Sequence, residues 1–484
     1  MKPELVEFLS RYRKIHVVGV SAQEGRAVFD YLLGWKPEAI VGHESGMRAD
    51  FPGSFMRFSD AYSKKEAETM LNRFLFFEDK INFGEDYLKD IESGDLVIVT
   101  QAWRRYKQNA PLFNLPEGID LKQAMEIVLM VINCRTIGVS GTAGKSTTTA
   151  FISSILKEAG INFYFSGNDR ENKWDIFEAE KLSPRDIALL EISHRHLMDL
   201  KTSPDVSVLT NVYPHHLDDA GSYENYLAIK KNIFRFQSTD DVAVINKSLF
   251  DSGEVALSEV PGELLVFGMD HSASARFDGE RIFLGSDEVV KLKELNFEGE
   301  HNALNAAAAA LVGRTIGADI AVIRRGLIAA KPLKYRMEKI GEKDGLVFWN
   351  DGKSSDPIAT IEAVKSVPDP LVLFLGGARE GGKAGDFSAL GKEIAMRRIS
   401  KIFVYGRSKE LILNDLAASG IDVSSVSEEE NLKSAIPAAF RYAEGKTGSV
   451  LFSPACQSFD EFKDYRERAE TFNSAVTDFI EARR

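Results

Sequence analysis

The chain has 484 residues, which is too many for one hydrophobic core and favours three domains of ordinary size. Hydrophobic residues make up 44% and charged residues 27%, which excludes large-scale disorder. A formal net charge of -12 argues against a nucleic-acid-binding surface, because such a surface needs a basic stripe.

The cellular compartment is suggested by the cysteines and by the opening residues. Cys134 and Cys456 are too few for a disulfide framework or a zinc site, and they fit a reducing compartment. The opening run "MKPELVEFLSRYRK" is interrupted by charges throughout, unlike a signal peptide. The apolar runs are far shorter than the ~20 residues of a membrane span. We therefore expect a cytoplasmic protein with no nucleic-acid partner and no membrane insertion.

Residues 1–133 alternate strand-like runs with helical segments, which is typical of a parallel sheet with crossover helices. The strand runs are "KIHVVGV", "EAIVGHE" and "DLVIVT". Residues 56–90 look like an insertion, and the stretch that begins at Ser63 is expected to be helix of mixed charge. A turn with Gly19 and Gly25 follows the first strand. That turn could meet a diphosphate, or its glycines could be purely structural.

The run "TIGVSGTAGKSTTTAFISSILKEAG" opens the range 134–331 and has the strand, glycine turn and helix order of a phosphate-binding loop. Backbone N–H groups and the helix N-terminus would surround the phosphates. Lys145 would reach the outer phosphates, and Ser146 could ligate magnesium. The alternative is an ordinary strand-to-helix turn, because Val139 stands where the strict motif has glycine.

Polar residues follow two further strand-like runs, where they would share one sheet edge with the loop. Glu191 lies near the end of "DIALLEIS", and His215 and His216 follow "VSVLTNV". A carboxylate in an apolar strand is costly unless it has a partner, so a metal-bound phosphate would explain Glu191. A structural salt bridge for Glu191 and a solvated loop for the histidines are the alternatives.

Later segments complete the α/β pattern. "SYENYLAIKKNIFRFQ" predicts a helix whose apolar stripe includes Lys230 or Lys231, and periodicity does not separate them. A lysine that snorkels to solvent is the alternative to a functional one. "FDGER" predicts a hairpin turn. The range 332–484 repeats strands in "LVFWND", "LVLFLGG", "KIFVYG" and "SVLFSP".

These residues resemble the Mur ligases, the ATP-dependent amide-bond-forming enzymes of cell-wall precursor synthesis, and most closely the branch that adds D-glutamate. The resemblance is carried, in the family's order, by "GTAGKST", "LLEIS", "TNV" with "HHLD", "YLAIKKNIF", "GEHNALNAAAAA", "YRMEKI", "WNDGKSSDP" and "SPACQSFDEFKDYRER". It implies three α/β domains. These are a Rossmann-like nucleotide-sugar (UDP) domain at 1–133, a central P-loop ATPase-type parallel-sheet domain at 134–331, and a Rossmann-like domain for the incoming amino acid at 332–484.

The resemblance also assigns roles to individual residues. It implies the catalytic residues Lys145, Glu191, His216, Lys230, Arg336 and Lys353. It implies ATP contacts at Gly141, Thr142, Gly144, Lys145, Ser146, Thr147, Asn302, Asn305, Arg336 and Asp351. Magnesium would be held by Ser146, Glu191, His216 and Lys230, the last of these carbamylated by carbon dioxide. Substrate contacts would be Gly19, Ser21, Gly25, Asn168, Ser193, Ser355, Lys383, Ser458 and Phe459.

The reaction implied by the resemblance joins D-glutamate to UDP-N-acetylmuramoyl-L-alanine through an acyl phosphate, in a monomeric enzyme. Burial of Lys230 among apolar neighbours would favour the neutral amine that carbamylation requires. A different acceptor or amino acid, or a non-catalytic nucleotide-binding protein on the same fold, are the alternatives. Several positions and segments depart from the family pattern, among them His215, Tyr335, Asp356, "SGNDR", "EISHRHL" and "TQAWRRYKQNAP".

Overall fold

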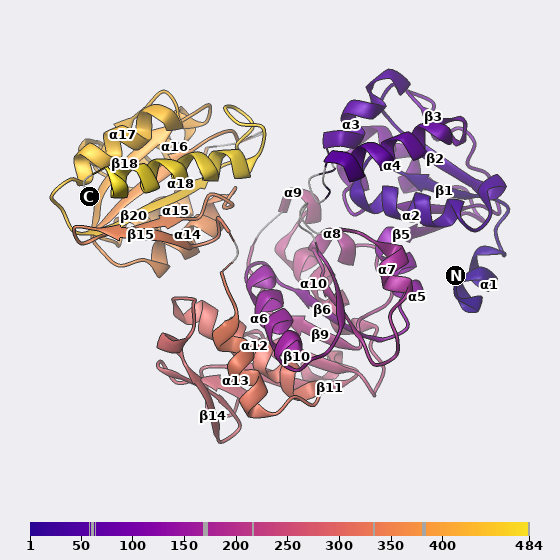
Figure 1. Ribbon diagram of the computed structural model, residues 1–484, viewed down its shortest axis with the longest axis horizontal. Coiled ribbons are helices and arrows are strands. Elements are labelled where there is room, and N and C mark those ends of the chain that lie inside the picture. Colours follow the sequence, from indigo (N-terminus) through magenta and orange to yellow (C-terminus); the bar gives the residue numbers. More distant parts are fainter. Residues whose placement is uncertain are drawn as a thin grey trace. The chain divides into compact units, whose positions relative to one another are not determined.

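The computed structural model describes residues 1–57, 59, 62, 64–167, 173–214, 217–332, 334–379 and 384–482 (Figure 1). The chain divides into two compact units. The first consists of Met1–Leu295 and Glu300–Ala330, and the second of Asn296–Gly299 and Lys331–Arg484. The first unit holds two separate sheets, one in the range 1–133 and one in the range 134–331.

The sheet of residues 1–133 has the strand order β3-β2-β1-β4-β5, and each neighbouring pair is parallel. The strands are β1 (Ile15–Val18), β2 (Ile40–Glu44), β3 (Ile81–Phe83), β4 (Leu96–Val99) and β5 (Asp120–Gln123). The helices are α1 (Pro3–Leu9), α2 (Gln23–Leu33), α3 (Phe51–Arg57), α4 (Lys64–Phe76) and α5 (Ala124–Val131). The helix expected from Ser63 onward is only partly right, because edge strand β3 follows α4.

The central sheet has the order β14-β13-β12-β11-β10-β9-β6-β8-β7. Its strands are β6 (Arg135–Ser140), β7 (Phe163–Ser166), β8 (Ile187–Glu191), β9 (Val206–Leu209), β10 (Val242–Asn246), β11 (Glu263–Gly268), β12 (Ala275–Phe277), β13 (Arg281–Leu284) and β14 (Asp287–Lys291). Strands β12 and β13 are antiparallel, so the hairpin turn predicted from "FDGER" is confirmed. Strands β11 and β12 pair in parallel.

The central helices surround the loop that follows β6. They are α6 (Lys145–Glu158), α7 (Ile176–Glu180), α8 (His194–Leu197), α9 (Leu217–Ala220), α10 (Tyr223–Arg235), α11 (Ser248–Asp251), α12 (Glu300–Thr315) and α13 (Ile320–Ala329). Helix α6 packs against α12 and α13 (Figure 1). Its Phe151, Ile152 and Ile155 are buried, as the helical period predicts. A Cβ at Gly326 would lie 2.6 Å from the Ile155 Cα, so glycine permits this close helix crossing.

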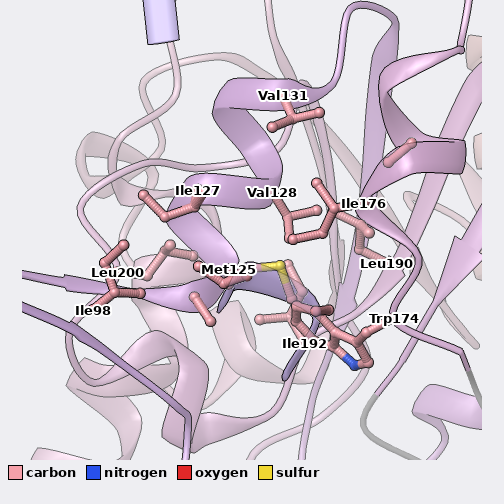
Figure 2. Packing of buried hydrophobic residues seen from close by; sticks show 14 of the residues in the cluster. Ile98, Met125, Ile127, Val128, Val131, Trp174, Ile176, Leu190, Ile192 and Leu200 are labelled. Atoms are coloured by element: carbon pink, nitrogen blue, oxygen red, sulfur yellow. The ribbon is translucent and has the colours of Figure 1, made fainter. Parts of the chain in front are cut away.

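The two sheets of the first unit share a hydrophobic core. Figure 2 shows α5 residues such as Met125 and Val128 beside Trp174, Ile176 and Leu190 from the central range. All five side chains are buried. Each fully buried apolar side chain of this size stabilises the fold by about 1.5–3 kcal/mol relative to leaving it exposed. The N-terminal and central sheets therefore form one packed body.

The second unit has the sheet order β15-β16-β20-β17-β18-β19, in which β15 and β16 are antiparallel and the other pairs are parallel. Its strands are β15 (Glu338–Lys343), β16 (Leu346–Asn350), β17 (Leu371–Gly376), β18 (Ile399–Tyr405), β19 (Val426–Glu428) and β20 (Gly448–Ala455). Its helices are α14 (Pro357–Ser366), α15 (Ser388–Ala395), α16 (Lys409–Ala418), α17 (Leu432–Ala443) and α18 (Tyr465–Glu481). The α/β class predicted from the alternating pattern is confirmed.

A membrane-spanning helix, which would have to be both long and apolar, is not found in the described ranges.

Candidate active site

The loop between β6 and α6 depends on two glycines in backbone conformations that other residues rarely adopt. Gly141 has φ +149° and Gly144 has φ +82°. A Cβ at Gly141 would lie 1.9 Å from Thr210 Oγ1, and a Cβ at Gly144 would lie 2.4 Å from Asn305 Oδ1. The loop is therefore a tight cradle that side chains at these positions would fill.

The cradle is held from the end of β9. Thr210 Oγ1 donates to the Ala143 carbonyl at 2.6 Å, and Asn211 Oδ1 accepts from the Ala143 N–H at 2.9 Å. The Asn211 carbonyl accepts from the Thr142 N–H at 2.9 Å. The amides in the first turn of α6, including those of Lys145 and Ser146, have no acceptor within their own helix and lie at its positive end. The arrangement suits an anion at the start of α6.

Two lysines far apart in the sequence meet at one carbonyl of the cradle. Lys145 Nζ donates to the Gly141 and Thr142 carbonyls, at 3.1 Å each. Lys230 Nζ donates to the same Gly141 carbonyl at 2.8 Å and lies 3.2 Å from Ser140 Oγ. The β6–α6 loop and helix α10 thus bring both amines to one point.

The structure separates Lys230 from Lys231, which the sequence pattern leaves open. Lys230 is 1% exposed, whereas Lys231 forms a 2.8 Å ion pair with Glu259. Burial, together with the nearby Lys145 ammonium, holds the pKa of Lys230 well below its ordinary value, and only the Glu191 carboxylate opposes this. The side chain therefore favours the neutral, nucleophilic amine.

Glu191 ends β8, where it pairs in register with Val139 of β6, and it is 4% exposed. Its carboxylate interacts electrostatically with Lys230. The predicted His215 and His216 lie outside the described residues. In the part of the chain that the structure describes, no three histidine, cysteine or acidic side chains gather as a metal site. Ser146, Glu191 and Lys230 are the described members of the expected magnesium set.

Two further polar side chains, Tyr226 and His194, lie near Lys230 and were not assigned a role from the sequence. Tyr226 places its hydroxyl 3.3 Å from Thr142 Oγ1 and its ring 5.5 Å from Lys230 Nζ. His194 Nε2 meets Asp219 Oδ2 at 3.2 Å, and burial lowers the pKa of His194 to about 4. The sequence signal for Tyr226 was its place one turn before Lys230 on the apolar stripe.

The asparagines of α12 lie next to the cradle and the first turn of α6. Asn305 Oδ1 accepts from Thr148 Oγ1 at 3.3 Å, and Asn305 Nδ2 donates to Asn302 Oδ1 at 3.3 Å. Both asparagines are buried. The geometry thus brings the expected ATP contacts of α12 beside the start of α6, where Thr147 is also buried.

The expected substrate contacts of the N-terminal range form a compact turn. Gly19 has φ +81°, and a Cβ at Gly25 would lie 2.2 Å from the Gly19 carbonyl oxygen, so α2 packs directly on the turn. Ser21 is buried, and its N–H donates to Glu44 Oε2 at 3.0 Å. Asn168 lies outside the described residues, and Ser193 lies at the start of α8.

In the second unit, Asp351 is fully enclosed. Burial raises the pKa of Asp351 to about 6, against hydrogen bonds from the Ser354 and Ser453 hydroxyls and the Arg336 charge. Burial and nearby Arg466 lower the pKa of Lys353 to about 8.

Arg336 lies in an unusual stretch of backbone in this unit. It stands between Tyr335 and Met337, which have the positive φ values +59° and +48°. Such strain in residues other than glycine is concentrated at functional sites.

The predicted amino-acid contacts of the second unit differ in exposure. Ser458 is buried, Ser355 is exposed, and Phe459 is 54% exposed. Lys383 lies outside the described residues.

Comparisons with known proteins show the family of the chain. Residues 139–313 match the model of the Mur ligase middle domain. A UDP-N-acetylmuramoylalanine--D-glutamate ligase of Acetivibrio thermocellus is 30% identical over 433 residues, covering 86% of this chain and 90% of the relative. The enzyme of the same name from Clostridium kluyveri is 29% identical, covering 96% and 97%.

The chain belongs to the Mur ligase family. Its fold is similar to MurC of Thermotoga maritima, with TM-score 0.56, 17% identity and coverage of 96% of this chain and 99% of MurC. It is also similar to MurF of Thermotoga maritima in complex with ADP, with TM-score 0.56, 18% identity and coverage of 81% and 97%. The Mur ligase resemblance and the α/β fold predicted from the sequence are confirmed.

Gly144→Ala tests the cradle of this Mur ligase. Left-handed backbone costs about 1–2 kcal/mol in a residue other than glycine, and here the Cβ would also press on Asn305. We expect Gly144→Ala to lower both the free energy of unfolding and the affinity for nucleotide. Gly160→Ala is the control, because Gly160 has φ +67° but open space around it. Equal unfolding midpoints and nucleotide affinities for the two variants would contradict the close contact.

Asp351 gives a prediction about pH. Its raised pKa means that the folded second unit binds a proton more tightly than the unfolded chain does. Its contribution to stability is therefore present below about pH 4 and is lost as the pH rises through about 6. A carboxyl ¹³C titration should give a midpoint near 6. Arg336→Gln should raise that midpoint, because the guanidinium favours the carboxylate.

The control for this titration is Lys339→Gln, which removes an exposed lysine of the same unit that is paired with Glu342. It should leave the midpoint unchanged. An unmoved midpoint in Arg336→Gln would show that the guanidinium does not act on Asp351.

Proposed function

We propose that this Mur ligase is an ATP-dependent, cytoplasmic, monomeric enzyme that joins D-glutamate to UDP-N-acetylmuramoyl-L-alanine. The observation that carries the proposal is the meeting of Lys145 and Lys230 at the Gly141 carbonyl, beside Glu191 and the start of α6. The names and coverage of the relatives support the choice of substrates.

The chemistry requires stabilisation of negative charge in two steps. The acceptor carboxylate attacks the γ-phosphate of ATP and gives an acyl phosphate. The amine of D-glutamate then attacks the acyl carbon, which forms the amide and releases phosphate. Lys145 and the amides at the start of α6 are placed to stabilise the charge that develops on phosphate oxygens.

The described residues fit a magnesium ion bound beside the cradle. The Ser146 hydroxyl and the Glu191 carboxylate are oxygen donors, which magnesium prefers. Bound magnesium would polarise the phosphoryl group. We include His216 in the set on the family resemblance alone.

Lys230 completes the proposed site as a carbamate. Its low pKa leaves a neutral amine whose nitrogen can attack carbon dioxide, with loss of one proton from that nitrogen. The product is an anion in a position that otherwise holds a neutral amine. That anion would bind and orient a second metal.

Residues of the second unit are proposed to complete the reaction. Arg336, Asp351 and Lys353 would contact ATP and the reacting groups. Ser355, Lys383, Ser458 and Phe459 would surround the incoming amino acid, where a lysine and hydroxyls suit a dicarboxylate.

Phosphate release from ATP tests the proposal when each substrate is omitted in turn. We expect release that requires both UDP-N-acetylmuramoyl-L-alanine and D-glutamate, with the amide product found by mass spectrometry. Release that requires another amino acid or acceptor would place the chain elsewhere among the Mur ligases. No release with any substrate panel would support a non-catalytic nucleotide-binding protein.

A further inference from the structure

Four residues form a closed ring of side-chain and backbone hydrogen bonds between the N-terminal and central ranges of the first unit. His196 Nε2 meets Glu24 Oε1 at 3.0 Å, and the other carboxylate oxygen of Glu24 accepts from the Gln101 N–H at 2.8 Å. Gln101 Oε1 accepts from Ser193 Oγ at 2.7 Å, and the Ser193 N–H donates to His196 Nδ1 at 3.2 Å. Glu24, Ser193 and His196 are each at most 4% exposed.

The ring has one consistent set of donors and acceptors. His196 Nδ1 accepts a backbone N–H, so Nε2 carries the proton and donates to the Glu24 carboxylate. The Ser193 hydroxyl donates to Gln101 and accepts the His196 N–H at 3.3 Å. A hydrogen-bonded network of this kind rigidifies the segments that it joins.

The segments joined by the ring are the ones on which ligation would depend. Glu24 lies in the first turn of α2, directly after the Gly19 turn, and Gln101 follows β4. Ser193 lies two residues beyond Glu191, at the end of β8. The ring therefore connects the Gly19 turn, which is proposed to hold the acceptor substrate, to strand β8, which carries Glu191.

A second set of contacts also joins the N-terminal range to the central range. Asp199 Oδ2 accepts from Trp103 Nε1 at 3.0 Å and from Gln123 Nε2 at 3.2 Å. Arg104 also pairs with Asp199 and lies over the Trp103 ring. These contacts and the ring join "TQAWRRYKQNAP" to the stretch beginning with "EISHRHL", two of the segments that depart from the family pattern. The departures are thus partners across one interface, and the chain neighbours Ile192 and Leu200 belong to the shared core in Figure 2.

We propose that Glu24, Gln101, Ser193 and His196 are positioning residues for the ligation, forming an interdomain latch. The latch sets the distance between an acceptor held at the Gly19 turn and the phosphate cradle beside Glu191. This inference rests on the proposed function. It also reassigns Ser193, whose hydroxyl is engaged within the latch, from a substrate contact to a positioning residue.

The test compares two substitutions at position 196 in the full-length protein. His196→Ala removes both hydrogen bonds of the ring. His196→Gln keeps an acceptor for the Ser193 N–H and a donor for Glu24. Glu24→Gln breaks the ring at the other side, because its amide N–H₂ would face a donor. Amide hydrogen exchange at residues 101 and 193–196 reports the latch without any substrate.

We expect His196→Ala and Glu24→Gln to speed that exchange by about tenfold or more, because each loses a hydrogen bond to a charged group. They should also raise KM for UDP-N-acetylmuramoyl-L-alanine by about tenfold and leave KM for ATP within about twofold. His196→Gln should restore both readouts. The variant that combines Glu24→Gln and His196→Ala should be no worse than the worse single variant.

Tyr31→Phe is the matched control. It removes a 2.9 Å hydrogen bond to Glu180 that also crosses between the two ranges but is not part of the ring. It should leave both KM values and the exchange at residues 193–196 unchanged.

Several results would overturn the latch. These are wild-type exchange in His196→Ala, equal impairment of His196→Gln and His196→Ala, or an equal rise in KM for ATP. If His196→Ala does not fold, Glu24→Gln and His196→Gln give the same comparison. The exchange measurement tests whether the latch exists even if the wild-type protein ligates a different substrate. The latch and the proposed function can therefore fail separately.

Discussion

Lys230→Ala should lower turnover by about 10²–10³-fold, because it removes the group proposed to become an anion beside the phosphate cradle. Burial of the Lys230 amine costs the folded protein free energy, and the substitution removes that cost. We therefore expect the variant to stay folded. Small carboxylates such as formate should restore part of the activity by entering the space left by the side chain. Steady-state phosphate release with and without added formate is the measurement.

Lys231→Ala is the control for this experiment. Lys231 is the next residue on α10, but its amine pairs with Glu259. Its loss should leave turnover within about twofold, because its amine pairs with Glu259 and not with the Gly141 carbonyl. Full activity in Lys230→Ala would remove Lys230 from the mechanism.

Lys145→Ala should lower turnover by about 10³-fold or more. The Lys145 ammonium contacts two carbonyl groups of the cradle. When ATP binds, it can exchange these contacts for phosphate oxygens. The substitution has a second consequence. Lys145 lowers the pKa of Lys230, so its loss should also reduce the fraction of neutral Lys230 amine.

Single-turnover phosphate release and ATP titration measure the effect of Lys145→Ala. Lys157→Ala is the control, because Lys157 lies in the exposed last turn of the same helix. Unchanged ATP affinity together with unchanged turnover in Lys145→Ala would contradict the assignment of the cradle to the triphosphate.

Local patterns were enough to predict much of the fold. The strand, glycine turn and helix around Gly144 follow from residues close in sequence, because the turn needs φ values that glycine permits. The alternation of strands and helices likewise predicted the parallel sheets. Strand β3 was missed because its three residues follow a long charged helix and show no period of their own.

The site was less predictable, because its contacts join distant segments. The helical period placed a lysine on the apolar face of α10, but only the packing against Ser140 and Gly141 selects Lys230 over Lys231. The role of Glu24 had no local signal. Its partner His196 is 172 positions away, and only the tertiary fold brings them together.

A crystal structure with magnesium and a non-hydrolysable ATP analogue tests the central claim most directly. We predict the triphosphate against the amides at the start of α6, Lys145 on its outer phosphates, a metal ion beside Ser146 and Glu191, and density for a carboxylate on Lys230 Nζ. A triphosphate bound away from the Gly141–Ser146 loop, or a metal remote from Glu191, would contradict the account.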